Sequence, residues 1–162
     1  MTAPQIFVKV AHHAVARADA TLVTLGLGSC VAILLHDAAA RVGGMAHILL
    51  PEQQLARDTS NPSKFATTAI PLLAAEVAAL AGRSARLEAR LVGGASMFPS
   101  LMTPGMLNMG ERNLIASRQV LRELGIPVLA EEVGADYGRS VRFHVGDGRV
   151  VVSSVGRADV TL

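Results

Sequence analysis

Short runs of apolar and β-branched residues recur along the chain, separated by glycine, proline and charged turn residues. Runs of this length and composition are typical of β-strands. They predict strands over residues 6–10, 21–25, 31–36, 42–50, 86–92, 127–130, 140–145 and 149–153. Turn residues at 37–41 and 146–148 join neighbouring runs, so these pairs of strands are expected to form hairpins.

Two longer segments carry inward positions at the spacing of three and four that is typical of an amphipathic helix. These positions are Ile70, Leu73, Val77 and Leu80 in the first segment and Leu114, Ser117, Leu121 and Leu124 in the second. Asn61 and Pro62 fit the cap and the first position of the first helix. Pro71 lacks a backbone donor, so it should kink that helix or delay its start.

Strands outnumber helices in this pattern, and consecutive strands are joined by hairpins. The expected fold is therefore an α/β sandwich with a mixed, largely hairpin-connected β-sheet and two main helices, not a doubly wound parallel sheet. The chain has 162 residues, of which 51% are apolar, and this fits a single domain spanning residues 1–162.

Composition narrows the range of functions. Aromatic residues make up only 3% of the chain, and the net charge of +2 is not concentrated in a basic run, so no nucleic-acid partner is expected. No apolar run is long enough for membrane insertion, and the N-terminal residues lack the pattern of a signal peptide. The single cysteine excludes an internal disulfide, and we expect a cytoplasmic protein.

Cys30 is the first candidate for chemistry. Free cysteine is among the most buried residue types, so its type alone favours an inert core thiol. Its position favours a reactive one, because it follows a glycine-rich turn at residues 26–29 and precedes a strongly apolar strand. Glycines allow another molecule to approach the backbone, and they leave N–H groups free to stabilise an oxyanion.

A thiol needs a base to act as a nucleophile at neutral pH, and the chain has five histidines. His12 and His13 lie in a polar stretch and His36 ends a strand, so these three are expected to be exposed. His47 lies inside the strand that should pair with the one after Cys30. The hairpin turn would place the two residues roughly opposite each other, with Cβ atoms about 5 Å apart. A hydrogen-bonded core histidine is the alternative.

A third group should fix the tautomer of the imidazole. Thr24, six residues before Cys30, could do so through its hydroxyl, although spacing alone favours an ordinary strand threonine. No cluster of histidine, aspartate and glutamate has the spacing of metal ligands, so no metal and no other cofactor is expected.

Four motifs resemble those of the CheD family, the chemoreceptor glutamine deamidases of bacterial chemotaxis. They are TLGLGSC at 24–30 with GGMAH at 43–47 and Pro51, GGASMF at 93–98, NMGERN at 108–113, and Gly134, Arg139 and Ser140 before the turn at 147–148. The motifs follow the family order and spacing over nearly the whole chain. The chain departs from the family at residues 133–135, which read Val-Gly-Ala in place of Thr-Gly-Gly, and at Pro71.

The resemblance implies an α/β sandwich that acts as a protein-glutamine glutaminase, a cysteine-dependent amidohydrolase. Its substrates would be glutamine side chains of methyl-accepting chemoreceptors, converted to glutamate and ammonia, and some members also hydrolyse glutamyl methyl esters. The catalytic cysteine, histidine and threonine of the family correspond to Cys30, His47 and Thr24. Many members bind the phosphatase CheC, which makes CheC a second expected partner.

Five residues of two glycine-rich segments are expected to form the oxyanion and substrate loops of this site. Gly28 and Ser29 precede the cysteine, and N–H groups beside them would bind the oxyanion. Gly93, Gly94 and Ser96 would form a rim of a shallow site. A plain turn is the simpler interpretation of the second segment, which lacks the ending of a phosphate loop.

Two other functions fit the same residues. One is a non-catalytic chemotaxis regulator that only binds CheC, which would not need the intact Cys30, His47 and Thr24. The other is a cysteine hydrolase that acts on a different protein or on a small amide. The deamidase hypothesis also predicts that Cys30 is alkylated faster than a model thiol at neutral pH.

Overall fold

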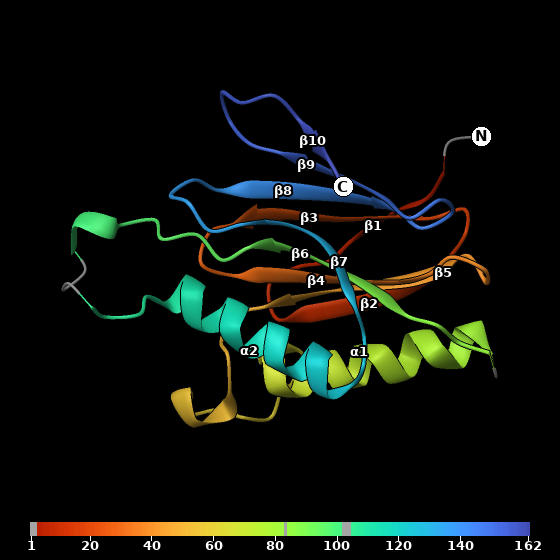
Figure 1. Cartoon of the computed structure of the whole chain (residues 1–162), viewed down its shortest axis with the longest axis horizontal. Coiled ribbons are helices and arrows are strands. Elements are labelled where there is room, and N and C mark those ends of the chain that lie inside the picture. Colours follow the sequence, from red (N-terminus) through yellow and green to blue (C-terminus); the bar gives the residue numbers. More distant parts are fainter. Residues whose placement is uncertain (1–2, 83, 102–104) are drawn as a thin grey trace.

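The computed structural model describes residues 3–82, 84–101 and 105–162. Two five-stranded β-sheets pack face to face, and two helices cover the outer face of one of them (Figure 1). The predicted α/β sandwich with two main helices is confirmed, and its strands are divided between two mixed sheets.

The first sheet has the strand order β1-β3-β8-β9-β10. Its strands are β1 (Gln5–Phe7), β3 (Thr21–Leu27), β8 (Arg139–His144), β9 (Arg149–Ser153) and β10 (Val160–Thr161). β1 pairs parallel with β3, and the remaining pairs are antiparallel. The predicted hairpin at the turn 146–148 joins β8 to β9.

The second sheet has the strand order β2-β5-β4-β6-β7. Its strands are β2 (His12–Arg17), β5 (Val42–Ile48), β4 (Val31–Asp37), β6 (Glu88–Gly93) and β7 (Val128–Val133). β4 and β5 form the predicted hairpin, and β6 pairs parallel with β7. The pattern of apolar residues missed β2, because its residues are polar and small rather than a run of large apolar side chains.

The two main helices are α1 (Ala66–Ala81) and α2 (Met109–Glu123), and three short 3-10 turns are η1 (Gln53–Leu55), η2 (Pro62–Lys64) and η3 (Pro99–Leu101). The Asn61 side chain caps η2 by accepting from the Ser63 N–H, and α1 begins only at Ala66. Asn61 and Pro62 thus open the short turn η2 and not the main helix as predicted, and Pro71 lies inside α1 after its start, so it does not account for the later start. No helix in the described residues is long and apolar enough to cross a membrane.

β4 and β5 divide their side chains between two cores. Val31, Ile33 and Leu35 pack toward the helices, whereas Cys30, Ala32 and Leu34 pack between the two sheets. Side chains alternate along a strand, so every second residue of β5 also points between the sheets. Met45 is one of these, and His47 follows it two residues later. The strand period therefore directs both Cys30 and His47 into the space between the sheets.

Two of the histidines that were expected to be exposed are not. His36 is buried, and its Nε2 lies 2.8 Å from the carbonyl of Val145. His13 is half-buried, with its ring nitrogens 2.7 Å from Ser63 Oγ and 2.6 Å from Glu76 Oε2. The two predictions of exposure were wrong because the residues that cover these histidines are far from them in the sequence. His12 is exposed, as predicted.

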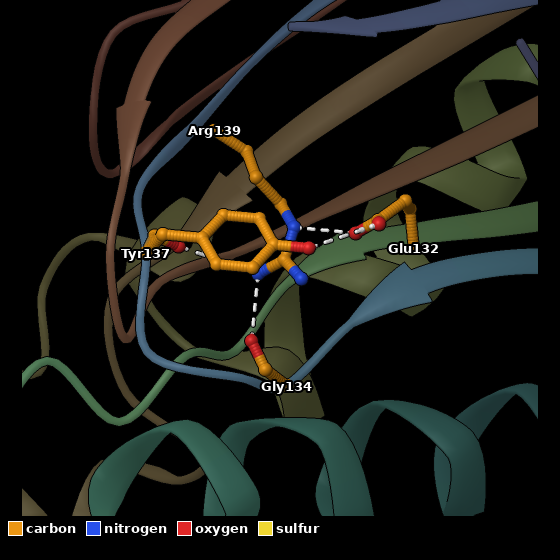
Figure 2. Close-up of polar contacts among 4 residues, drawn as sticks. All are labelled: Glu132, Gly134, Tyr137 and Arg139. Atoms are coloured by element: carbon orange, nitrogen blue, oxygen red, sulfur yellow. Dashed lines mark hydrogen bonds and ion pairs between the residues drawn. The ribbon is translucent and has the colours of Figure 1, made fainter. Parts of the chain in front are cut away.

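A buried ion pair ties the two sheets together where β7 leads into β8. Figure 2 shows the Arg139 guanidinium beneath the ring of Tyr137, with Nε 2.5 Å from Glu132 Oε2. Arg139 Nη1 also donates to the carbonyl of Gly134 at 2.7 Å, and the ring centroid of Tyr137 lies 4.4 Å from the guanidinium carbon. The charge of Arg139 is therefore buried but fully matched by neighbouring groups.

The burial of Arg139 gives a prediction, and a second arginine that pairs with the neighbouring glutamate of β7 provides the control. Arg139 is 1% exposed in its ion pair with Glu132, whereas Arg118 is 38% exposed in its pair with Glu131. Because removal of Arg139 leaves the half-buried Glu132 carboxylate without its partner and removes a fully buried side chain, Arg139→Ala should lower the free energy of unfolding by about 3 kcal/mol. Arg118→Ala should lower it by less than about 1 kcal/mol. Chemical denaturation measures both, and equal losses would contradict the structural role of Arg139.

Candidate active site

Three side chains named from the sequence meet between the sheets. Thr24 comes from β3 of the first sheet, and its side chain lies against His47 from β5 of the second. Cys30 stands immediately before β4, the strand next to β5. Thr24 and His47 are 1% and 3% exposed, and Cys30 is 9% exposed. All three residues are therefore almost completely buried, and Cys30 is the most exposed of them.

The hairpin register differs from the predicted one by two residues. His47 lies opposite Ala32, and continuing the register places Leu49 across from Cys30. Cys30 and His47 are thus diagonal neighbours on one face of the sheet, at a separation that long or aromatic side chains can bridge. Both side chains line the same cavity.

The hydrogen bonds around Thr24 determine the tautomer of His47. Thr24 Oγ1 lies 2.6 Å from the carbonyl oxygen of Val8, which can only accept, so the single hydroxyl proton is donated there. His47 Nδ1 lies 2.7 Å from the same Oγ1 and must therefore be the donor in that contact. Neutral His47 then carries its proton on Nδ1 and a free electron pair on Nε2.

The second ring nitrogen of His47 has no partner. Nε2 is buried and makes no hydrogen bond within the described residues. A buried polar atom without a partner costs free energy and needs an explanation in a folded protein. His47 lines the cavity together with Cys30, so its unprotonated nitrogen belongs to the same pocket as the only thiol of the chain.

Burial makes the uncharged forms of this pair the resting ones. It lowers the pKa of His47 to about 4, because the imidazolium would lose its hydration. Burial also raises the pKa of the Cys30 thiol, and the N–H of Cys30 itself lowers that pKa to a lesser extent. These shifts argue against the predicted fast alkylation at neutral pH, since a thiol with a raised pKa holds little thiolate at rest.

A cavity of about 710 Å³ opens beside the thiol and the imidazole. Its other walls come from the end of β1, from the segment that follows it and from β3; they are Phe7, Val8, Lys9, Val10, Val23, Leu25 and Gly26. Phe7, Val10 and Leu25 are exposed apolar side chains around this cavity. Exposed apolar side chains that lie together often mark a site where another molecule binds. The cysteine and the histidine are therefore surrounded by an apolar surface on which a large molecule could pack.

The glycine-rich segment at 93–96 is hydrogen-bonded to the backbone of the other one, at 26–29, and of Cys30. Gly94 N–H donates to the Cys30 carbonyl at 2.8 Å, and Ala95 N–H donates to the Gly28 carbonyl at 2.9 Å. Gly93 has φ +109°, and a Cβ there would lie 2.3 Å from the Cys30 carbonyl oxygen, so only glycine fits. The structure thus places this segment behind the cysteine, where it fixes the backbone, while other residues line the cavity.

The remaining loop residues extend this backbone network. The Ser96 N–H donates to the carbonyl of Ala135 at 2.8 Å, which links the segment to the turn between β7 and β8. Ser29 and Gly28 are half-buried, and the Ser29 carbonyl accepts from Asn113. Roles of these residues in binding a substrate or an oxyanion stay predictions.

Sequence reasoning missed two contributors to the site. Val8 acts through its backbone carbonyl, so no side-chain pattern could reveal it. Asn113 contacts the residue before Cys30 and the residue two beyond His47, at Ser29 and Leu49. Its only signal in the sequence was its place in the NMGERN motif, which was noted for the resemblance without a role.

The low pKa of His47 predicts how stability depends on pH. The unfolded chain binds a proton at His47 near the ordinary pKa of 6.5, whereas the folded chain does so only near 4. The unfolded state therefore gains protons first as the pH falls, and wild-type stability should drop by about 3 kcal/mol more between neutral pH and pH 4 than that of His47→Gln. Denaturation curves over this range measure the difference. Parallel pH profiles would show that His47 is not held neutral by the fold.

Known proteins are similar in sequence to this chain over most of its length. A family model described as CheD chemotactic sensory transduction matches residues 49–154. The probable chemoreceptor glutamine deamidase CheD of Caldanaerobacter subterraneus subsp. tengcongensis is 44% identical over 149 residues, which cover 92% of each chain. The chemoreceptor glutamine deamidase CheD of Thermotoga maritima is 42% identical over 147 residues, covering 91% of this chain and 90% of that one. The chain therefore belongs to the CheD family.

Proposed function

We propose that this chain is a chemoreceptor glutamine deamidase, a single-domain cytoplasmic enzyme that hydrolyses glutamine side chains of methyl-accepting receptors. Cys30 is the nucleophile, His47 the general base and acid, and Thr24 the residue that orients the imidazole. Its relatives of 42% and 44% identity carry the name chemoreceptor glutamine deamidase. The reaction uses water and needs no metal or other cofactor.

The observation that carries this proposal is the free Nε2 of His47. The Thr24 hydroxyl donates to the Val8 carbonyl and accepts from Nδ1–H of His47, so Nε2 is left unprotonated in a residue that lines the same cavity as Cys30. A cysteine hydrolase needs this arrangement of nucleophile, base and orienting group. A protein that only bound a partner would gain nothing from a buried nitrogen without a hydrogen bond.

The first half of the reaction forms a thioester. Because the resting pair is neutral, His47 Nε2 takes the thiol proton as Sγ of Cys30 attacks the side-chain carbonyl carbon of the glutamine. The resulting tetrahedral oxyanion accepts hydrogen bonds from backbone N–H groups at Ser29 and Cys30. As the intermediate collapses, Nε2–H gives its proton to the leaving nitrogen, the C–N bond breaks, and ammonia departs.

The second half returns the enzyme to its starting state. A water molecule takes the place of ammonia and gives a proton to Nε2 while its oxygen attacks the thioester carbonyl. The C–S bond then breaks, the proton on Nε2 returns to the thiol, and the product is a glutamate side chain. The sum is one amide and one water converted to one carboxylic acid and one ammonia.

The surface around the thiol fits a receptor rather than a free amide. Phe7, Val10 and Leu25 expose apolar surface around the cavity, and Lys9 adds a positive charge. A glutamine on the surface of a receptor could extend into the cavity while neighbouring apolar side chains pack on this rim. This favours a protein substrate over the alternative of a small amide.

The test is peptide mapping of a methyl-accepting receptor co-expressed with the wild-type chain, with Cys30→Ala and with Cys30→Ser. Wild type should convert specific receptor glutamines to glutamate. Both variants should lose at least about 1,000-fold in rate, because removal of the nucleophile stops the shared first step.

Thermal unfolding of the two variants is the control, since each should fold like the wild type. Full conversion by Cys30→Ala would refute the mechanism. A receptor left unchanged by the wild-type chain would favour the regulator that only binds CheC.

A further inference from the structure

Asn113 connects helix α2 to the candidate active site through side-chain hydrogen bonds. Its side chain is fully buried, and Nδ2 donates two hydrogen bonds, to the Ser29 carbonyl at 2.9 Å and to the Leu49 carbonyl at 3.1 Å. Ser29 directly precedes Cys30, and Leu49 lies two residues beyond His47. One amide group thus holds the segments that carry both the nucleophile and the base.

The first of these bonds sets the direction of the Cys30 N–H. In a trans peptide the carbonyl and the following N–H point in opposite directions. The Ser29 carbonyl points at Asn113, so the Cys30 N–H points away from α2. In the described part of the chain this N–H donates to no other residue, which leaves it free for a reacting group.

The burial of Asn113 has a cost that packing alone does not explain. Its Oδ1 is buried and has no hydrogen-bond partner among the described residues. A buried amide whose oxygen has no hydrogen bond makes the fold less stable than an apolar side chain of similar size would. The helix is also pressed close to the site, since a Cβ on Gly110 would lie 2.4 Å from the Ala95 carbonyl oxygen. A residue kept at this cost, in this close contact, fits a functional role.

We infer that Asn113 is a positioning residue that holds the Ser29–Cys30 peptide so that the Cys30 N–H points at the developing oxyanion. This inference rests on the proposed deamidase function and assigns a role to a residue outside the cysteine, histidine and threonine. Asn113 touches neither the substrate nor the thiol. It acts through the Ser29 carbonyl, and its second hydrogen bond, to the Leu49 carbonyl, fixes the position of α2 relative to the end of β5, the strand that carries His47.

The experiment compares two reactions of the same thiol. Addition to an amide carbonyl forms an oxyanion, whereas alkylation by iodoacetamide displaces iodide and forms none. In Asn113→Ala and Asn113→Asp, kcat for the receptor on which the wild type is active should fall roughly 10- to 100-fold, with KM changed less than about threefold. The alkylation rate of Cys30 should change less than about threefold in the same proteins.

Ser117→Ala is the matched control. Ser117 is also fully buried on α2, and among the described residues its hydroxyl bonds only the Asn113 backbone carbonyl, so this variant should keep the wild-type kcat. If an Asn113 variant does not fold, Asn113→Ser replaces it, because a hydroxyl can still donate to one carbonyl.

Several outcomes would overturn the inference. Equal losses in deamidation and alkylation would mean that Asn113 only maintains the fold. A wild-type kcat in the Asn113 variants, together with loss of activity in Cys30→Ala, would refute the inference and leave the proposed function intact. An inactive wild type, or full activity of Cys30→Ala, would refute both.

Discussion

The hydrogen bond from His47 Nδ1 to Thr24 Oγ1 crosses the space between the two sheets, and the chemistry of the site depends on it. Each partner belongs to a different sheet, so the bond forms only when the sandwich has closed. The Val8 carbonyl ends this series of hydrogen bonds by accepting from the Thr24 hydroxyl. The Thr24 hydroxyl has a single proton, which it donates to Val8, so the proton between Thr24 and His47 must be on Nδ1. Nε2 of the neutral ring is therefore unprotonated.

A buried histidine and a buried thiol form a neutral pair, unlike the preformed ion pair of a strongly activated cysteine. Desolvation raises the pKa of Cys30 and lowers that of His47, so in the proposed mechanism proton transfer accompanies attack on the substrate. The protein then has to place its groups accurately, because no stored thiolate compensates for poor alignment. The backbone bonds from Gly94 and Ala95 to the cysteine segment, and those from Asn113, supply this placement.

Much of the fold was predictable because strands and helices have different apolar periods. β3, β4, β5, β8 and β9 lie where their apolar runs predicted them, and the alternation along β5 follows from the strand period. β2 was not predictable, since its polar and small residues are held by pairing with β5. The buried position of His36 depends on Val145, a contact between residues far apart in the sequence.

The candidate site was predictable in its side chains but not in its geometry. Cys30 and His47 were found from a glycine turn and a neighbouring strand, whereas the register between them was two residues from the predicted one. Thr24 required the family resemblance, because its partner lies on the other sheet. Nothing in the residue pattern could reveal the Val8 carbonyl or the resting protonation state, which arise from backbone position and burial.

The most direct measurement of the central claim is nitrogen NMR of the His47 ring, assigned by its absence in His47→Gln. At neutral pH the spectrum should show a neutral imidazole that is protonated at Nδ1 and unprotonated at Nε2. Thr24→Val should disturb this state, whereas Thr21→Val on the same strand should not. An imidazolium, or a neutral ring protonated at Nε2, would contradict the proposed base.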